Sequence, residues 1–288
     1  MALRYPKPTH ARVVAVQLWE EAELLPRPRG IFFSAIVQSA WLVSISLGIC
    51  LLSAITLSAD EKQHNVVCRD SLLAQHRADL AVKLRRITGW PDLYFDSLGI
   101  LRTGARAPVG GSKSARDLVM SVIFGRNVVV LEDASRSSAV AFSQVIPGRW
   151  KRAPPDNPPA FVVQIDFADF EHVLGDERAL QAFDVGWAVL HEFDHIVNDS
   201  KDATSLDETG ECESHINQMR RECNLPQRAD YFFTFLPLAK DSAFITRLVR
   251  LAFDQEQKTA NKRKRYWLVW DANVVGGMYE QKQVASMR

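Results

Sequence analysis

The sequence predicts an α+β domain that follows a single N-terminal transmembrane helix. Two observations carry this prediction. Residues 31–59 contain no charged side chain, and beyond them short β-branched segments precede longer segments in which apolar residues recur at helical spacing. Helices and a small sheet in separate parts of a chain are typical of the α+β class. We therefore divide the 288-residue chain into residues 1–30, residues 31–59 and a folded domain over residues 60–288.

The composition is that of an ordinary folded protein, with 47% hydrophobic and 24% charged residues. Lysine and arginine total 35, and aspartate and glutamate total 34, so the formal net charge is +1. This balance argues against a general nucleic-acid-binding protein, which would carry a basic excess. Four cysteines in 288 residues exclude a small scaffold that is held together by many disulfides.

The uncharged residues 31–59 are long enough to cross a bilayer. A helix rises about 1.5 Å per residue, so this segment exceeds a hydrocarbon core of about 30 Å. Arg27 and Arg29 precede it, and Asp60 and Glu61 follow it. The positive-inside tendency then places the N-terminus in the cytoplasm and the folded domain on the other side of the membrane. A cleaved signal peptide is the alternative, and its removal would leave the domain secreted.

The first half of the domain is predicted to contain two helices and three strands. Apolar and charged residues alternate at helical spacing over residues 68–88, and Trp90-Pro91 follows as a helix-ending signal. A shorter helix is expected over Ser114–Phe124. The three predicted strands are rich in β-branched residues and are bounded by turn residues: Asn127–Leu131, Ala139–Ile146 and Phe161–Phe167.

The second half of the domain is predicted to be mainly helical. Ser205 and Glu208 have the spacing of a capping box at the start of the second of its helices. One late strand is expected at Tyr266–Asp271, and the basic run Lys258–Arg265 before it is interpreted as a solvated loop. The three predicted helices are Asp176–Asn198, Asp207–Cys223 and Leu238–Gln255.

Cysteine positions restrict the disulfides that the domain can form. Cys212 and Cys223 lie on one predicted helix, about 16 Å apart along its axis. This separation is too large for a disulfide between them. At most one disulfide can form, and it would involve Cys68; three free thiols are the alternative.

The segment VGWAVLHEFDHIVND contains the pattern H-E-x-x-H as His191, Glu192 and His195. The residues before it are apolar and include no proline, so the pattern is expected within a helix. Positions i and i+4 of a helix lie on one face, which brings two imidazoles close enough to bind a single Zn²⁺. Glu192 lies at the edge of that face, where it can accept a proton from a water as general base. We therefore expect a zinc site with Glu192 as the catalytic residue.

A catalytic zinc needs a third protein ligand and an open position. The next predicted helix supplies the candidates. We favour Glu213, because Asn217 follows it by one helical turn and can orient a ligand histidine. Glu211 and His215 lie elsewhere around the same helix and remain alternatives.

The two motifs together give a family resemblance. H-E-x-x-H with a glutamate on the next helix resembles the gluzincin-type zinc metallopeptidases. Residues 216–231, INQMRRECNLPQRADY, are similar to a segment of the secreted-effector zinc metallopeptidases of bacterial pathogens and related toxin domains, which has the pattern E-N-x-I-R-x-E-L-G-L-P-x-R-x-x-Y. The matching residues are Asn217, Arg220, Glu222, Leu225, Pro226, Arg228 and Tyr231.

Two positions depart from the family pattern. Ile216 replaces a glutamate, which leaves open which acidic residue completes the site. Asn224 replaces a glycine, a mild change because asparagine tolerates the left-handed conformation that ends a helix.

The resemblance implies a zincin-like fold, in which a small sheet accompanies the H-E-x-x-H helix and a following ligand helix. It also implies zinc-dependent hydrolysis of peptide bonds in a peptide or protein substrate. By the same analogy, strand Phe161–Phe167 would line the cleft and pair with an extended substrate, and Tyr231 would donate a hydrogen bond in the transition state. The alternatives are a non-catalytic binding module that a metal stabilises and a proteolytic toxin or effector domain.

Overall fold

The computed structural model describes most of the predicted domain. The predicted transmembrane segment, residues 31–59, lies outside the described residues. Within the described part, no helix is long and apolar enough to cross a membrane. Cys68, Cys212 and Cys223 are free thiols. The described residues are 64–135, 137–150, 157–206, 208–237, 245–257 and 262–276.

The first sheet has four strands in the order β1-β4-β6-β5. Strands β1 (Val66–Cys68), β4 (Val128–Asp133) and β6 (Ala160–Ile165) run parallel. Strand β5 (Ser143–Pro147) pairs antiparallel with β6 and forms one edge. The three β-branched strands that the sequence predicts are β4, β5 and β6.

The expectation that Phe161–Phe167 pairs with a substrate is wrong. This segment is mostly β6, which already has β4 on one side and β5 on the other. An interior strand has no free backbone groups to offer a further strand. The edge strand on this side of the sheet is β5 instead.

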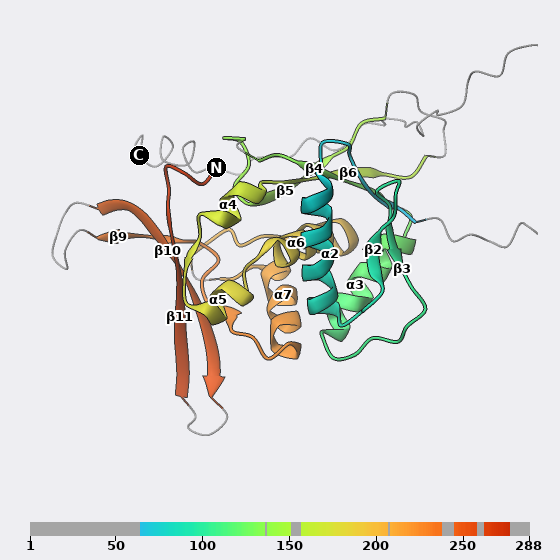
Figure 1. The fold of residues 1–288 in the computed structure, drawn as a ribbon. Coiled ribbons are helices and arrows are strands. Elements are labelled where there is room, and N and C mark those ends of the chain that lie inside the picture. Colours follow the sequence, from blue (N-terminus) through green and yellow to red (C-terminus); the bar gives the residue numbers. More distant parts are fainter. Residues whose placement is uncertain are drawn as a thin grey trace, which may run out of the picture. The chain divides into compact units, whose positions relative to one another are not determined.

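Four helices pack together on one side of the first sheet (Figure 1). They are α2 (Ala74–Thr88), α3 (Lys113–Phe124), α6 (Val185–Asn198) and α7 (Glu211–Glu222). Helix α6 is central, because it contacts the other three helices as well as β5 and β6. Its buried residues join the main hydrophobic core, so the H-E-x-x-H helix is held from several sides.

Local capping contacts explain why α6 and α7 begin at other residues than the sequence predicts. The carboxylate of Asp184 accepts hydrogen bonds from the backbone of Gly186 and Trp187 and starts α6. This cap separates α6 from the five-residue α5 (Glu177–Gln181), so the predicted helix Asp176–Asn198 is divided in two. Helix α7 begins at Glu211, after Gly210 rather than after the predicted capping box. There, Glu208 accepts from the backbone N–H groups of Thr204 and Ser205 at 2.7 and 3.2 Å, within the preceding turn.

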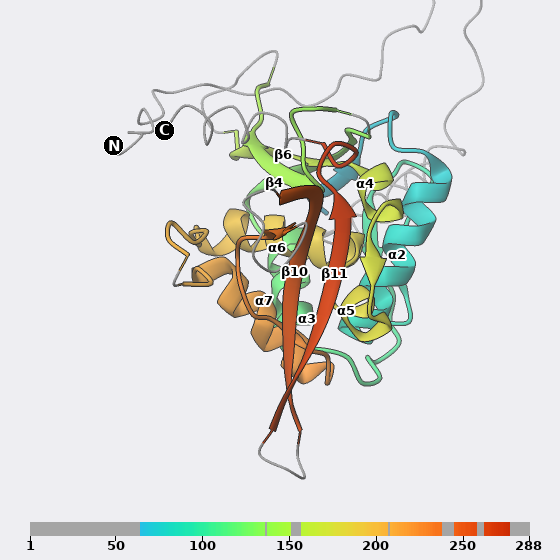
Figure 2. The same ribbon diagram turned by 90° about the vertical axis from the view of Figure 1, so that its left-hand side faces the viewer.

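The second sheet is a long antiparallel ribbon of β10 (Ile245–Gln257) and β11 (Lys262–Asp271), joined by shorter strands at both sides. Figure 2 shows this ribbon running past the helices. The strand order is β7-β11-β10-β8, and β9 also pairs with β10. The shorter strands are β7 (Leu174–Gly175), β8 (Gln227–Arg228) and β9 (Thr234–Pro237).

The predicted helix Leu238–Gln255 is wrong, because its residues from Ile245 onward form β10. The reason is the alternation of Val249, Leu251 and Phe253, which are all buried in a second core cluster. That period of two matches a strand and not a helix. The late strand is confirmed as β11, but it starts earlier, at Lys262, so part of the basic run is strand rather than loop.

A hairpin of two strands and one further helix complete the described domain. Strands β2 (Leu93–Phe95) and β3 (Leu101–Thr103) form a small hairpin, and β2 contacts α2. Helix α4 (Phe167–Glu171) follows β6 directly. The described fold therefore combines several helices with small sheets, which confirms the prediction of a mixed fold at that level.

Candidate metal centre

Helix α6 brings His191 and His195 together, as the spacing of the motif predicts. Their Nε2 atoms lie 3.1 Å apart, and the side chains are 15% and 17% exposed. The Nδ1 atom of His195 lies 2.8 Å from the carbonyl oxygen of Ser200, which fixes the ring. Two imidazole nitrogens that converge on one point are a typical start of a metal site.

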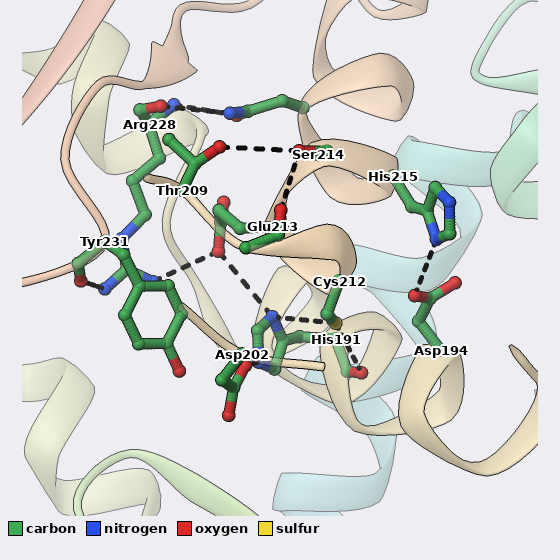
Figure 3. Close-up of polar contacts among 12 residues, drawn as sticks. His191, Asp194, Asp202, Thr209, Cys212, Glu213, Ser214, His215, Arg228 and Tyr231 are labelled. Atoms are coloured by element: carbon green, nitrogen blue, oxygen red, sulfur yellow. Dashed lines mark hydrogen bonds and ion pairs between the residues drawn. The ribbon is translucent and has the colours of Figure 1, made fainter. Parts of the chain in front are cut away.

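The loop after α6 returns Asp202 to the two histidines. Asp199 adopts a left-handed conformation with φ 51° and ends the helix, so that the chain turns back. A β-bridge between Asp202 and Gly210 holds the loop against the start of α7. Asp202 Oδ1 thereby lies 3.1 Å from His191 Nε2 and 3.3 Å from His195 Nε2. Figure 3 shows Asp202 beside His191.

Cys212 is the fourth member of the cluster. It is fully buried at the start of α7, and its Sγ lies 3.3 Å from His191 Nδ1. The thiol also contacts the carbonyl oxygen of His191 at 3.4 Å. The ligand atoms of His191, His195, Asp202 and Cys212 all lie within 4.8 Å of one another, so this group can hold a metal ion.

The structure places Glu213 beside this cluster and not within it. Its side chain is 1% exposed, and its Oε2 lies 3.6 Å from His191 Nδ1, the ring nitrogen that faces away from Asp202. Arg220 and Arg228 both pair with its carboxylate, Arg228 at 3.1 Å. These two positive charges hold the pKa of Glu213 well below its usual range despite the opposing effect of burial.

The two alternative ligands also lie outside the cluster. Glu211 is exposed at the first position of α7. His215 turns toward another partner, with its Nδ1 2.9 Å from Asp194 Oδ2 and 3.4 Å from Ser200 Oγ. His215 therefore supports the loop in which the carbonyl oxygen of Ser200 contacts His195 Nδ1.

Glu192 is buried, and its position in the fold agrees with the motif. Ser143 Oγ, at the first position of β5, donates to Glu192 Oε1 at 2.7 Å. Burial raises the pKa of Glu192, and the nearby His191 and the Ser143 hydroxyl oppose that shift. The carboxylate is therefore anchored to the edge strand of the first sheet.

Tyr231 lies next to the cluster, beside His191 and Arg228. Its ring stacks near His191 with 6.4 Å between ring centroids, and the guanidinium carbon of Arg228 lies 4.8 Å from the Tyr231 ring centroid. Burial raises the pKa of its hydroxyl, and the charge of Asp202 adds to the shift. The phenol is therefore a hydrogen-bond donor at neutral pH.

Hydrogen bonds within the cluster raise the pKa values of its two histidines. Burial lowers the pKa of His195, but hydrogen bonds to Asp202 and Cys212 outweigh it and raise the pKa to about 11. The pKa of His191 is raised for the same reason. The two histidines in turn hold the pKa of Asp202 far below its usual range, against burial. Such a set, with two basic nitrogens around one carboxylate, has the donor chemistry that a divalent metal can take over from protons.

No known protein family, curated protein or solved structure matches this chain. The site is therefore interpreted from its own residues. The sequence did not predict Asp202, Cys212 or Ser143 as members of the site. Asp202 follows His195 by seven residues, beyond the end of α6, and an acidic residue that close to the motif is a signal that could have found it. Ser143 gives no such signal, because its contact with Glu192 depends on the pairing of β5 with β6.

Proposed function

We propose that this protein is a zinc-dependent peptidase of zincin-like fold, with His191, His195 and Asp202 as its metal ligands. The observation that carries the proposal is the convergence of their three ligand atoms, with all pairs at 3.1–3.3 Å. Two histidine nitrogens and one carboxylate are a common ligand set of catalytic zinc. Zinc held there would lower the pKa of a water toward 7 and polarise a substrate carbonyl.

Asp202 takes the place of Glu213 in this proposal. The carboxylate of Glu213 is neutralised by Arg220 and Arg228 and faces His191 Nδ1. Asp202 faces the Nε2 atoms of both histidines. A carboxylate behind the remote nitrogen of a ligand histidine fixes the ring and raises its basicity. Glu213 therefore suits a positioning role.

Glu192 is the general base of the proposed reaction. It follows His191 on α6 and is buried, and this burial raises its pKa above the ordinary value of a glutamate, as suits a general base. Its carboxylate would take a proton from the water whose oxygen attacks the scissile carbonyl carbon, and the carboxyl would give that proton to the amine nitrogen as the C–N bond breaks. The hydrogen bond from Ser143 keeps one oxygen of the carboxylate occupied and orients the group.

The substrate is proposed to bind along β5. This strand is the edge of the first sheet, and its first residue contacts Glu192. An extended peptide can add to such an edge through backbone hydrogen bonds. A scissile bond beside Ser143 would then lie close to the general base, with Tyr231 on the other side of His191 as a hydrogen-bond donor.

Cys212 favours a second candidate function. A set of two histidines, one aspartate and one cysteine can close a tetrahedral zinc site, and closed sites are structural. The protein would then be a non-catalytic module that the metal stabilises. The two functions differ in what Cys212 does, because an open catalytic site does not need its thiol.

Metal analysis and hydrolysis of a peptide library test both functions on the full-length protein. The peptidase predicts about one zinc per chain, and hydrolysis that Glu192→Gln lowers at least about 100-fold without loss of zinc. Glu211→Gln, an exposed carboxylate on α7, is the matched control and should change neither quantity. Bound zinc without hydrolysis, together with zinc loss in Cys212→Ser, would instead establish the structural module. A protein that binds no zinc would end both proposals.

A further inference from the structure

A cavity of about 380 Å³ lies between α2 and β2. The hairpin of β2 and β3 stands beside α2 at this point (Figure 1). None of the residues that line the cavity belongs to the metal centre. The cavity is therefore a separate feature of the domain, and the proposed peptidase reaction does not use it.

Two arginines give the cavity a positive charge. Arg77 and Arg85 both line it and lie eight residues apart on α2, on one face of the helix. Neither forms an ion pair with any residue that the structure describes, although Arg85 Nη1 donates to the carbonyl oxygen of Leu93 at 3.0 Å. The acidic lining residue, Asp96, does not neutralise them. Its carboxylate accepts hydrogen bonds from Arg102 Nε at 2.9 Å and from the backbone N–H groups of Leu98 and Ile100.

The same surface exposes large apolar side chains. Tyr94 and Val82 line the cavity and are 47% and 50% exposed. Leu73 and Leu98, which are next in sequence to lining residues, are 59% and 72% exposed. Exposed apolar groups that gather in one place mark interaction sites, and tyrosine and arginine are enriched in protein interfaces. Charge and apolar exposure thus coincide at the α2–β2 surface.

We propose that the α2–β2 surface binds a peptide segment of a partner protein that carries acidic and large apolar side chains. Acidic groups of the segment pair with Arg77 and Arg85, which lack acidic partners. The cavity is near the lower limit of small-molecule pockets, and its rim side chains Val82 and Tyr94 are about half exposed. A peptide can cover these two apolar side chains and pair with both arginines, so the exposure at the rim favours a peptide over a small amphipathic acid.

Fluorescence anisotropy with a labelled peptide of alternating glutamate and leucine tests this proposal on the full-length protein. All arms carry Glu192→Gln, so that hydrolysis cannot remove the peptide. We expect saturable binding that the double substitution Arg77→Gln/Arg85→Gln weakens at least tenfold. Arg126→Gln is the matched control, because Arg126 is exposed and does not line the cavity. Peptides with glutamine for glutamate, or serine for leucine, should each bind at least tenfold more weakly.

Three results would overturn the proposal. The first is no binding at peptide concentrations up to about 1 mM, which corresponds to only about 4 kcal/mol of binding free energy. The second is equal binding of the glutamine peptide or of the double variant, which would remove the role of the two arginines. The third is binding of laurate at one molecule per chain in place of the peptide, which would assign the cavity to a small amphipathic acid. Each result is independent of whether the metal centre is catalytic.

Discussion

Glu213 Oε2 lies 3.6 Å from His191 Nδ1, on the opposite edge of the ring from the Nε2 atom that faces His195. His191 therefore stands between a buried carboxylate and the candidate metal position. Two arginines hold that carboxylate in place, and Asn217 accepts from Arg220 and from the backbone of Arg228. The candidate metal cluster is thus supported by residues of α7 and β8 that lie within segment 216–231.

This arrangement predicts different effects of two carboxylate substitutions on zinc binding. Asp202→Asn should abolish stoichiometric zinc, because Asp202 faces both Nε2 atoms. Glu213→Gln should retain one zinc per chain but weaken its affinity about 10- to 100-fold, as expected when the group behind a ligand histidine is lost. Competition with a chelating dye measures both affinities.

The control for this pair is Asp199→Asn, which changes an exposed acid on the same loop and should leave zinc affinity unchanged. Zinc loss in Glu213→Gln together with full affinity in Asp202→Asn would contradict the assignment. That outcome would restore Glu213 as the third ligand, as the sequence pattern alone predicts.

A second prediction concerns the stability of the Glu213 support. Arg220 is 2% exposed and donates to Glu213, to Asn217 at 2.9 Å and to the carbonyl oxygen of Ala182 at 2.9 Å. Arg220→Met removes the charge and leaves the buried carboxylate with less compensation. The free energy of unfolding should fall by about 3–5 kcal/mol, the usual cost of breaking a buried ion pair from one side. Urea unfolding monitored by circular dichroism measures it.

Arg221→Met is the matched control for this substitution. Arg221 is the next residue of α7, and it is exposed and bonded only to glutamine side chains among the described contacts. Its substitution should cost less than about 0.5 kcal/mol. Equal losses in the two variants would show that Arg220 acts through helix propensity and not through Glu213.

The local part of the site could be predicted from the sequence, and the long-range part could not. His191 and His195 are four residues apart on one helix, so their approach follows from helix geometry alone. Asn224 was expected to tolerate a left-handed conformation, and its φ of 54° confirms this. Asp202 reaches the cluster only because its loop bridges to Gly210, a contact that no periodic pattern encodes.

The fold shows the same division between local and long-range information. Strands β4 and β6 are rich in apolar, β-branched residues and were predicted within a few residues. Strand β10 was mistaken for a helix, because its charged residues also fit a helical face. Pairing with β11 fixes this segment as a strand, since ten residue pairs of the two strands are in register. Tertiary pairing here overrides a local pattern that suits either structure.

A third prediction concerns the edge strand and the general base. Ser143 follows Phe142, whose φ of 65° is a rare conformation for an aromatic residue. Asp169 accepts from the backbone N–H of Phe142 at 2.9 Å and fixes this turn. If Ser143 positions Glu192, then Ser143→Ala should lower kcat about tenfold while zinc content and KM stay unchanged. Ser143→Thr keeps a hydroxyl and should restore most of the rate.

Steady-state kinetics on a cleaved library peptide distinguishes this role from a general loss of structure. Ser121→Ala, on the exposed face of α3, is the control and should match the unsubstituted protein. If Ser143→Ala and Ser143→Thr lose the same activity, or if zinc is lost with them, then the hydroxyl does not orient the base.

The final prediction is a pH dependence of stability that arises at Glu222. Its carboxylate accepts from Ser112 Oγ at 2.7 Å and from the hydroxyl and backbone N–H of Ser114 at 2.6 and 2.9 Å, which ties α7 to the N-terminus of α3. Partial burial would raise its pKa, but these hydrogen bonds and one from Gln218 lower it from 4.5 to about 2. A depressed pKa in the folded state stabilises the protein above the unfolded value, and this contribution disappears as the pH falls from about 4.5 to about 2.

Glu222→Gln should therefore lower the Tm by about 2–4 °C at pH 7, which corresponds to about 1 kcal/mol in a domain of this size. The difference from the unsubstituted protein should shrink through that acid range and vanish near pH 2, where Glu222 itself is protonated. Differential scanning fluorimetry at several pH values follows it, with Glu211→Gln on the same helix as the control. Only the contribution that depends on the charge of Glu222 disappears at low pH. A Tm difference that stays constant down to pH 2 would therefore mean that the substitution acts through side-chain packing and not through this charge.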